Sequence, residues 1–381
     1  MAAASDLVNG GVAALQIEEE LEEPPEQKNN AAAVLALAPV PWVAAVAERY
    51  ERREKLGEGM FGDVYKAWDR VLERFVAVKR LSGRTDDRFV KTSLGYFARE
   101  VMSLAACRGH PSVVQLLATY ADCGRADGDC FVVTEYAGPM NLRQYMDVRR
   151  RNGEPFDEDE VRDVMEQLLA GARHAHRAGI LHRDIVPENV IVDMDSARDD
   201  GAIGGRMVYK ICGFGVSEPA AQAEKDDSGL LAASSPYRAP ELFLGSKDYD
   251  GRVDTWSLGC IMAELVVGDG VPFFGGTQDG EVFNEMLHVV GTKGIVTWKG
   301  LERVAPREKA ARLRKMGRGE RGYLKKKFAP EVLSPAGFEV LKGLLHSNPD
   351  RRLSAAAALR KPWFLRRRFF SACCFMPKGG P

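Results

Sequence analysis

Cysteine is scarce in this sequence, and its spacing matches neither a disulfide framework nor a zinc site. The 381 residues include seven cysteines, an odd number, and no two of them stand in a CxxC pattern. Only Cys373 and Cys374 are neighbours. Disulfide scaffolds and structural zinc sites need several closely spaced cysteines. We therefore expect reduced thiols in an intracellular protein of the nucleus or the cytoplasm.

A strong excess of either charge is also missing. Lysine and arginine together number 53, against 54 aspartates and glutamates. The chain as a whole therefore has no field that would attract nucleic acid or an anionic membrane, and we expect neither as a partner. Hydrophobic residues make up 45% of the sequence, as in soluble globular proteins. The length allows one large bilobal domain or two smaller domains.

The sequence contains no uninterrupted hydrophobic run of membrane-spanning length. The nearest candidate, Ala31–Ala47, is shorter than the roughly 20 residues of a membrane helix, and Pro39 and Pro41 interrupt it. The acidic run Glu18–Glu23 precedes it, where a secretory signal would have basic residues. We interpret residues 1–48 as a flexible leader rich in alanine and glutamate, and we expect no membrane anchor in it.

Glycines cluster shortly after Tyr50, where the folded pattern begins. Residues 56–64 read Leu-Gly-Glu-Gly-Met-Phe-Gly-Asp-Val, which is a GxGxxGxV pattern. Glycine lets the backbone of a hairpin approach phosphate groups closely, because it has no Cβ and its φ angle is unrestricted. A glycine-rich stretch alone is more often only a turn, so the pattern gains meaning from the residues downstream of it.

A lysine and a glutamate further along fit a phosphate anchor and its counter-ion. Lys79 ends an apolar strand predicted over Val76–Lys79; alone, it would be interpreted as a solvated charge. Glu100 lies in a segment whose apolar residues recur at helical spacing. These residues are Phe97, Val101 and Leu104. Because the glycine pattern precedes them, we interpret Lys79 as a phosphate anchor that Glu100 holds in place.

A second apolar strand is predicted over residues 131–137, Phe-Val-Val-Thr-Glu-Tyr-Ala. It runs into Gly138-Pro139, a pair that suits a connector between two lobes. We expect the backbone of this segment to meet an adenine ring, with Thr134 beside a deeper pocket.

The most specific string is residues 180–191, Ile-Leu-His-Arg-Asp-Ile-Val-Pro-Glu-Asn-Val-Ile. It follows an amphipathic helix predicted over Val161–Ala178. Asp184 and Asn189 stand five residues apart on one loop, which suits the acceptance of a hydroxyl proton and the binding of a metal ion. Together with the glycine pattern, Lys79 and Glu100, this string resembles the signature set of eukaryotic protein kinases.

Three later motifs extend the resemblance over about residues 50–364. Tyr237–Glu241 resembles the end of the activation segment, in the form typical of cyclin-dependent and mitogen-activated kinases. Asp254–Gly259 matches the central helix of the large lobe. Asn348–Arg352 matches a late motif whose arginine pairs with Glu241.

The resemblance implies an α+β fold, the bilobal fold of a protein kinase. A small β-rich N-lobe is expected over 50–137 and a large, mainly helical C-lobe over 138–364, followed by a basic C-terminal tail at 365–381. Residues 283–328 occupy the position of the insert typical of this group. The basic residues of this insert are more often a solvated face than a docking site.

By resemblance, the chain binds ATP and magnesium and transfers phosphate to serine or threonine in a protein substrate. Asp184 would act as the base, Lys79 and Glu100 as the phosphate clamp, and Asn189 as the metal ligand. Because Arg238 is present, a proline after the target residue is expected. By the same resemblance, further nucleotide contacts are expected from the glycine pattern, from the strands predicted over 76–79 and 131–137, and from the strand after the catalytic loop. These positions are Leu56, Gly57, Gly59, Gly62, Val64, Ala77, Thr134, Glu135, Ala137 and Ile191.

Two departures concern the phosphate that the family transfers. The metal loop reads Gly213-Phe214-Gly215, where the family has an aspartate that binds magnesium between the β- and γ-phosphates. Val186 replaces a family lysine near the γ-phosphate. Metal stabilisation is worth several kcal/mol, so we expect a rate loss of about a thousandfold or more and at most a weak, single-ion site at Asn189.

Other departures concern regulation. The helix around Glu100 lacks the PSTAIRE-type string, so a cyclin and a different regulatory protein both stay open as partners. No threonine occupies the usual phosphorylation position, where Gly229 and Ser228 stand. Arg183 is retained, so a pocket for a phosphate is expected there, and Ser234 favours serine/threonine over tyrosine specificity.

Two classes of function therefore remain. The first is a serine/threonine kinase with impaired catalysis. The second is a pseudokinase that binds nucleotide weakly and acts through its surfaces as a scaffold or regulator. Gly213 and Val186 favour the second class, whereas Asp184, Lys79 and Glu100 favour the first.

Overall fold

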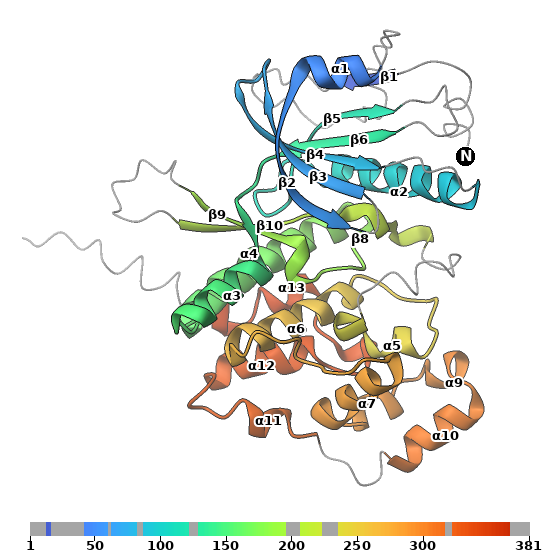
Figure 1. The fold of residues 1–381 in the computed structure, drawn as a ribbon. Coiled ribbons are helices and arrows are strands. Elements are labelled where there is room, and N and C mark those ends of the chain that lie inside the picture. Colours follow the sequence, from blue (N-terminus) through green and yellow to red (C-terminus); the bar gives the residue numbers. More distant parts are fainter. Residues whose placement is uncertain are drawn as a thin grey trace, which may run out of the picture. The chain divides into compact units, whose positions relative to one another are not determined.

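The computed structural model describes residues 13–16, 42–59, 62–81, 87–121, 129–195, 206–222, 235–316 and 322–365. The chain divides into two compact units. Unit 1 comprises Met1–Gly109 and Val114–Ala137, and unit 2 comprises His110–Val113 and Gly138–Pro381. Unit 1 is rich in strands and unit 2 is mainly helical (Figure 1), which confirms the predicted α+β fold of a bilobal kinase.

Unit 1 is built on an antiparallel sheet in which the described strands follow the order β1-β5-β6-β4-β3-β2. The strands are β1 (Ala13–Gln16), β2 (Tyr50–Gly59), β3 (Gly62–Asp69), β4 (Arg74–Leu81), β5 (Leu116–Ala121) and β6 (Cys130–Glu135). The helices are α1 (Trp42–Arg49), beside β2, and α2 (Asp87–Ala106), beside β5 and β6. Alternating apolar residues of the strands form the core. Its buried members include Val76, Val78, Tyr120 and Val133.

Unit 2 combines five short strands in its described part with a mainly helical body (Figure 1). The strands are β7 (Met140–Asn141), β8 (Ile180–Leu181), β9 (Val190–Asp195), β10 (Arg206–Ile211) and β11 (Glu218–Pro219). The longer helices are α3 (Leu142–Asn152), α4 (Glu158–Arg177), α6 (Arg252–Val267), α7 (Asp279–Val290), α10 (Arg307–Met316) and α12 (Pro335–Leu344). The short helices are α5 (Pro240–Phe243), α8 (Lys293–Val296), α9 (Leu301–Val304), α11 (Leu324–Lys327) and α13 (Ala355–Ala358).

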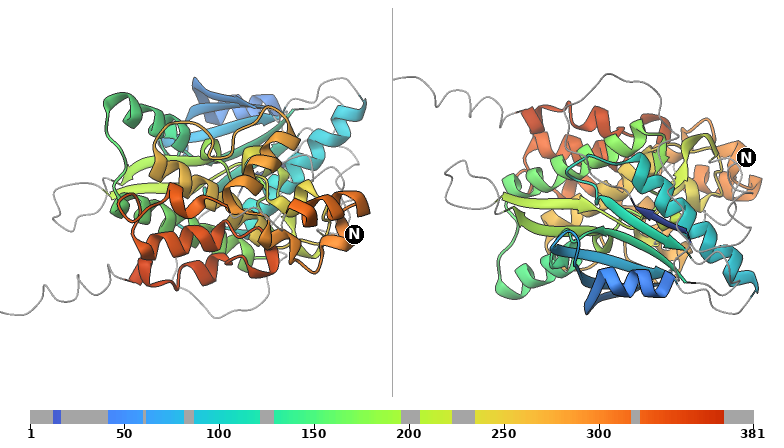
Figure 2. Two further views of the ribbon diagram at one scale, coloured as in Figure 1. Left: turned by 90° about the horizontal axis from the view of Figure 1, so that it is seen from below. Right: turned by 90° about the horizontal axis from the view of Figure 1, so that it is seen from above.

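Helix α6 is the centre of unit 2. Its side chains are buried on every face from Val253 to Leu265, the pattern of a helix surrounded by other elements. It packs against α4 and α12, and Figure 2 shows the red C-terminal helices close beside it. Helix α4 begins at an Asp157–Glu160 capping box and turns its apolar side toward this core. Among the described helices, none is both long and apolar enough to cross a membrane.

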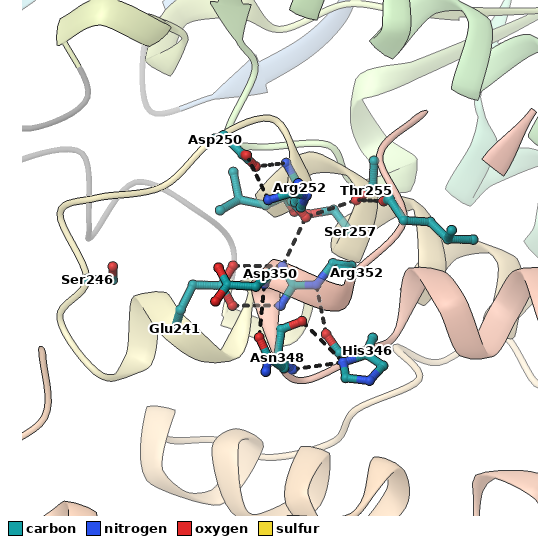
Figure 3. A network of polar contacts seen from close by, with 12 residues as sticks. Glu241, Ser246, Asp250, Arg252, Thr255, Ser257, His346, Asn348, Asp350 and Arg352 are labelled. Atoms are coloured by element: carbon teal, nitrogen blue, oxygen red, sulfur yellow. Dashed lines mark hydrogen bonds and ion pairs between the residues drawn. The ribbon is translucent and has the colours of Figure 1, made fainter. Parts of the chain in front are cut away.

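A buried ion pair joins α5 to the segment that follows α12 (Figure 3). Arg352 donates from Nη1 and Nη2 to the two carboxylate oxygens of Glu241, each at 2.7 Å. Glu241 is 1% exposed and Arg352 is 3% exposed. Arg352 also donates to the backbone oxygens of His346 and Arg252, at 2.9 and 3.0 Å. The pairing predicted for these two residues is confirmed, in the bidentate geometry that makes such pairs strong.

Candidate active site

The glycine pattern forms the hairpin between β2 and β3. Gly57 pairs with Val64 and Gly59 pairs with Gly62 in the strand register. Gly62 has φ +128°, and a Cβ there would lie 1.9 Å from the carbonyl oxygen of Arg80, so the packing of the hairpin on β4 requires glycine at this position. A Cβ at Gly57 would meet nothing within 4 Å. The fold of the chain therefore explains Gly62 but leaves Gly57 open to another explanation, such as a ligand.

Met60 and Phe61, which stand between Gly59 and Gly62 in the sequence, lie outside the described residues.

The predicted ion pair between β4 and α2 is present in unit 1. Lys79 Nζ lies 2.6 Å from Glu100 Oε2, and both side chains are largely buried, at 16% and 6% exposure. An ion pair with this little solvent around it holds the ammonium in a fixed place, because a displaced partner would leave a buried charge. The structure therefore brings Lys79 and Glu100 together.

Four of the expected nucleotide contacts share one face of the unit 1 sheet. Val64 is directly opposite Lys79 in the register, and Ala77 is directly opposite Thr134. Directly paired residues project to the same side, as do residues two apart along a strand. Val64, Ala77, Lys79 and Thr134 therefore form one surface.

The remaining predicted positions of unit 1 are placed differently. Leu56 is half-buried on β2. Glu135 ends β6, and its carboxylate accepts a hydrogen bond from the backbone N–H of Gln115 at 3.0 Å. Ala137 is buried at the end of unit 1.

In unit 2, Asp184 and Asn189 are held together on the loop between β8 and β9. Asn189 Nδ2 donates to the backbone oxygen of Asp184 at 2.9 Å and to its carboxylate Oδ2 at 3.0 Å. The predicted contact Ile191 lies on β9, half-buried and opposite Lys210 of β10. The structure thus joins the predicted base to the predicted metal ligand.

Asp254 of α6 supports this loop from beneath. Its carboxylate accepts the backbone N–H groups of His182 at 3.0 Å and Arg183 at 2.7 Å, and it lies 2.7 Å from His176 Nε2. Burial alone would raise the pKa of Asp254, but these partners hold it below its ordinary value. Asp254 is therefore an ionised anchor that fixes the backbone just before Asp184. His176, which has no place in the sequence motifs, was not predicted.

The glycine of the metal loop, Gly213, has a backbone conformation that residues other than glycine adopt less readily. Gly213 has φ +80° and ψ 42°, in the left-handed region. A Cβ there would lie 2.6 Å from Asn189 Oδ1, so a side chain at this position would project against the amide of Asn189. The next residue, Phe214, is 1% exposed and packs edge-on against the His182 ring at 4.6 Å.

At the metal loop, the side-chain oxygen that could meet a magnesium ion is the amide oxygen of Asn189. Asn189 Oδ1 is directed toward the Cβ position of Gly213, where the family carries its carboxylate. Within the described residues, no group of three or more His, Cys, Asp or Glu side chains is placed to hold a metal. Magnesium sites commonly combine one or two carboxylates with oxygens of the substrate phosphates and water. Here the chain offers an amide oxygen, and Val186, the other departure, is 4% exposed and uncharged.

The expected phosphate pocket at Arg183 is filled by a carboxylate of the chain itself. The Arg183 guanidinium is buried, with φ +69° at its backbone. It forms an ion pair with Glu218, donates from Nε to the backbone oxygen of Val216 at 2.8 Å, and donates from Nη1 to Tyr249 Oη at 3.1 Å. Glu218 is 5% exposed. The carboxylate thus takes the partner position that the sequence led us to expect for a phosphate.

We expect Glu218→Gln to destabilise unit 2 by about 1–3 kcal/mol, because the buried guanidinium would lose its charged partner while keeping a hydrogen-bond acceptor. Urea unfolding followed by fluorescence measures the change. Glu339→Gln, at an exposed ion pair with Lys342, is the matched control and should have little effect. Equal stability of the Glu218→Gln and wild-type proteins would show that the pair is not a structural support.

Comparison with known proteins places these features in a family. Residues 50–364 match the protein kinase domain family. This chain belongs to the protein kinases. This chain is 42% identical over 326 residues to a protein of Oryza sativa subsp. japonica named "Putative cyclin-dependent kinase F-2", a match that covers 83% of this chain and 90% of the relative.

Two further relatives place the kinase domain in the cyclin-dependent-kinase-like group of serine/threonine kinases. Identity is 34% over 320 residues to "Cell division control protein 2 homolog 3" of Trypanosoma brucei brucei, covering 83% of this chain and 92% of the relative. Identity is 33% over 344 residues to "Cyclin-dependent kinase G1" of Arabidopsis thaliana, covering 87% of this chain. The chain spans only about half, 51%, of that last relative.

Three predicted positions of the activation segment lie outside the described part of the chain, and one residue near the catalytic loop was not predicted. Ser228, Gly229 and Ser234 lie outside the described residues. Arg143 of α3 was not predicted, although it donates to Glu188 of the catalytic loop at 3.1 Å and to buried Glu264 at 2.8 Å. Arg143 belongs to none of the sequence motifs, so neither contact could be predicted from them.

Proposed function

We propose that this kinase domain binds ATP and transfers its phosphate to serine or threonine of a protein substrate at a strongly reduced rate. The observation that carries the proposal is Gly213, a glycine beside Asn189 where the family has its metal-binding carboxylate. The ion pair of Lys79 with Glu100 and the joined Asp184 and Asn189 support the retention of the other parts.

Each unit has a separate role in this proposal. In unit 1, Lys79 and the glycine hairpin bind phosphates, and the face carrying Val64, Ala77 and Thr134 contacts the base. In unit 2, Asp184 accepts the proton of the substrate hydroxyl while Asp254 keeps its loop in place. Bound magnesium would neutralise phosphate charge, and Asn189 Oδ1 would hold it without a carboxylate at 213.

The missing carboxylate accounts for a slow reaction. Metal stabilisation of the transferring phosphate supplies several kcal/mol, and a loss of about 4 kcal/mol corresponds to roughly a thousandfold in rate. Some activity is expected to remain, because Asp184 can still accept the hydroxyl proton and Lys79 can still position the phosphates without a carboxylate at position 213.

A second candidate function is a pseudokinase that binds nucleotide and acts as a scaffold or regulator. The absence of a carboxylate at 213 together with buried, uncharged Val186 favours it. The regulatory partner in either function is a protein; the relatives' names say cyclin-dependent kinase, and we include a cyclin among the candidates for this chain.

Phosphotransfer from radiolabelled ATP to a protein substrate, with and without cyclins, separates the two functions. If the chain is a slow kinase, we expect the wild-type protein to label the substrate weakly and the Asp184→Asn variant not to label it. Asp184→Asn keeps the size of the side chain and an acceptor for Asn189 but cannot accept the hydroxyl proton. Labelling that survives Asp184→Asn would come from a contaminant. If the wild-type protein gives no labelling with any cyclin tested, the pseudokinase is favoured.

For any activity, we expect a preference for proline after the target residue. Arg238 lies just before α5, and its backbone N–H donates a hydrogen bond to the backbone oxygen of Ser235 at 3.2 Å. In this group of kinases the arginine supports a turn that leaves an apolar slot, and proline is tolerated there because it has no N–H to satisfy. Another residue would bury an unpaired donor at about 1–3 kcal/mol. A peptide array with the Gly213→Asp protein tests this: Ser-Pro and Ser-Ala peptides labelled equally would refute it.

A further inference from the structure

A cavity of about 420 Å³ lies in unit 2 among α5, α7 and α10, three helices seen together in Figure 1. This volume is within the range of ligand pockets and has room for a few side chains. It is lined by residues of all three helices and by Arg238, and it is separate from Asp184 and its loop.

One side of the cavity rests on a hydrophobic core that the insert shares with α7 and with the end of α5. Helices α8, α9 and α10 pack their apolar residues against α7. The buried members of this core are Leu244, Phe283, Leu287, Ile295, Trp298, Leu301, Ala305, Ala310 and Leu313. Such a core holds α10 in place, so the residues that α10 presents to the cavity are fixed in position. The insert is therefore more than the solvated basic face that its sequence favours.

The cavity has an apolar wall. Leu242, Phe283 and Leu313 contribute it from three different helices, and each is at most 9% exposed. Phe243 is partly buried beside them. A wall of this kind favours an apolar side chain over a small hydrated ion.

Two basic residues of α10 stand at the same cavity, and neither is paired with a carboxylate in the described part of the chain. Lys309 donates from Nζ to the Phe243 backbone oxygen at 3.0 Å and lies 5.3 Å from the centre of the Phe283 ring. Burial lowers the pKa of Lys309. Arg312 is exposed at the rim. By contrast, Arg314 on the same helix is paired with Glu302 at 2.7 Å.

The acidic residue at the cavity already has its partners. Asp279 accepts from Arg238 Nη1 at 2.6 Å and from Ser235 Oγ at 2.7 Å. Burial alone would raise the pKa of Asp279, but these two partners keep it below its ordinary value. The unneutralised charge of the cavity is therefore positive and lies on the α10 side.

We propose that this cavity docks a short acidic segment of a partner protein, in which an apolar side chain is flanked by aspartate or glutamate. The apolar side chain would fill the wall of Leu242, Phe283 and Leu313. Its acidic neighbours would face Lys309 and Arg312, away from Asp279. A protein segment fits better than a free anion, because an anion would leave the apolar wall uncovered.

Fluorescence anisotropy of labelled peptides tests this docking site without any nucleotide. The probe is a glycine-serine peptide with a central Glu-Leu-Glu; its comparison peptides carry Lys-Leu-Lys, Glu-Ala-Glu or Gly-phosphoserine-Gly at the centre. We expect the full-length protein to bind the Glu-Leu-Glu probe about tenfold or more tightly than each of the three comparison peptides.

Two variants of the protein address the cavity in different ways. Lys309→Met keeps the apolar stem and removes the charge, and it should weaken binding about tenfold. Lys315→Met, on the same helix but away from the cavity, makes the same change in net charge and should leave binding unaltered. Gly280→Phe should also weaken binding about tenfold by filling the cavity, since a Cβ at Gly280 meets nothing within 4 Å.

The melting temperature of each variant shows whether it is folded. Gly280→Phe changes no charge, so weaker binding by this variant would come from the filled cavity. The proposal is overturned if Lys309→Met and Lys315→Met weaken binding equally, since the attraction would then be unspecific. It is also overturned if Gly280→Phe binds like the wild type, or if the phosphoserine peptide binds as tightly as Glu-Leu-Glu.

Discussion

Gly213→Asp is expected to raise the rate of phosphotransfer by at least about tenfold, because it returns a carboxylate to the metal loop. The backbone at Gly213 has φ +80°, a region that aspartate and asparagine enter more readily than other side chains. The new Cβ would lie 2.6 Å from Asn189 Oδ1 and 2.7 Å from Asn189 Cγ, so the whole Asn189 side chain must shift away from position 213. Steady-state labelling of a protein substrate measures the gain.

The control for this prediction is Gly213→Asn, which has the same shape and the same backbone preference but no charge. A gain with aspartate and none with asparagine identifies the carboxylate as the missing group. Adding Val186→Lys should increase the rate further, although the buried site at Val186 will reduce the stability of that double variant. If neither the single nor the double variant is faster, the activation segment or a missing partner limits the reaction instead.

The second large effect is expected from Glu241→Ala, which should lower the free energy of unfolding by about 3–5 kcal/mol. The substitution leaves the Arg352 guanidinium buried with no carboxylate, whereas both of its Nη groups are now satisfied at 2.7 Å (Figure 3). Urea unfolding of the two proteins gives the difference.

Glu302→Ala serves as the comparison for Glu241→Ala. It breaks an ion pair of the same 2.7 Å length with Arg314, but in a pair whose side chains are 66% and 49% exposed. Exposed pairs contribute less than about 1 kcal/mol. If both substitutions cost the same, burial is not what makes the Glu241–Arg352 pair important.

The sequence was sufficient for the parts of the site that derive from local patterns and family motifs. Lys79 and Glu100 form the predicted ion pair, and Glu241 pairs with Arg352 as expected. These pairs were accessible because each partner belongs to a motif whose role is known. The same holds for the fold, whose strand and helix patterns are regular.

The parts that escaped prediction depend on residues that belong to no recognised sequence motif. Glu218 lies 35 residues from Arg183, and nothing in its neighbourhood distinguishes it from a surface glutamate. The cavity depends on three helices, two of them in a region whose basic composition suggested only a solvated face. The left-handed backbone of Gly213 was equally hidden, because glycine permits that conformation without requiring it.

The central claim is that nucleotide binding survives in this kinase domain although the carboxylate ligand for magnesium is gone. Melting of the protein with ATP, in magnesium or in EDTA, tests it most directly. We expect ATP to raise the melting temperature in both solutions, by an amount that corresponds to about 2.7 kcal/mol at a hundredfold excess over Kd. We also expect Lys79→Met to abolish the shift. A shift that appears only with magnesium would show that nucleotide binding depends on the metal ion.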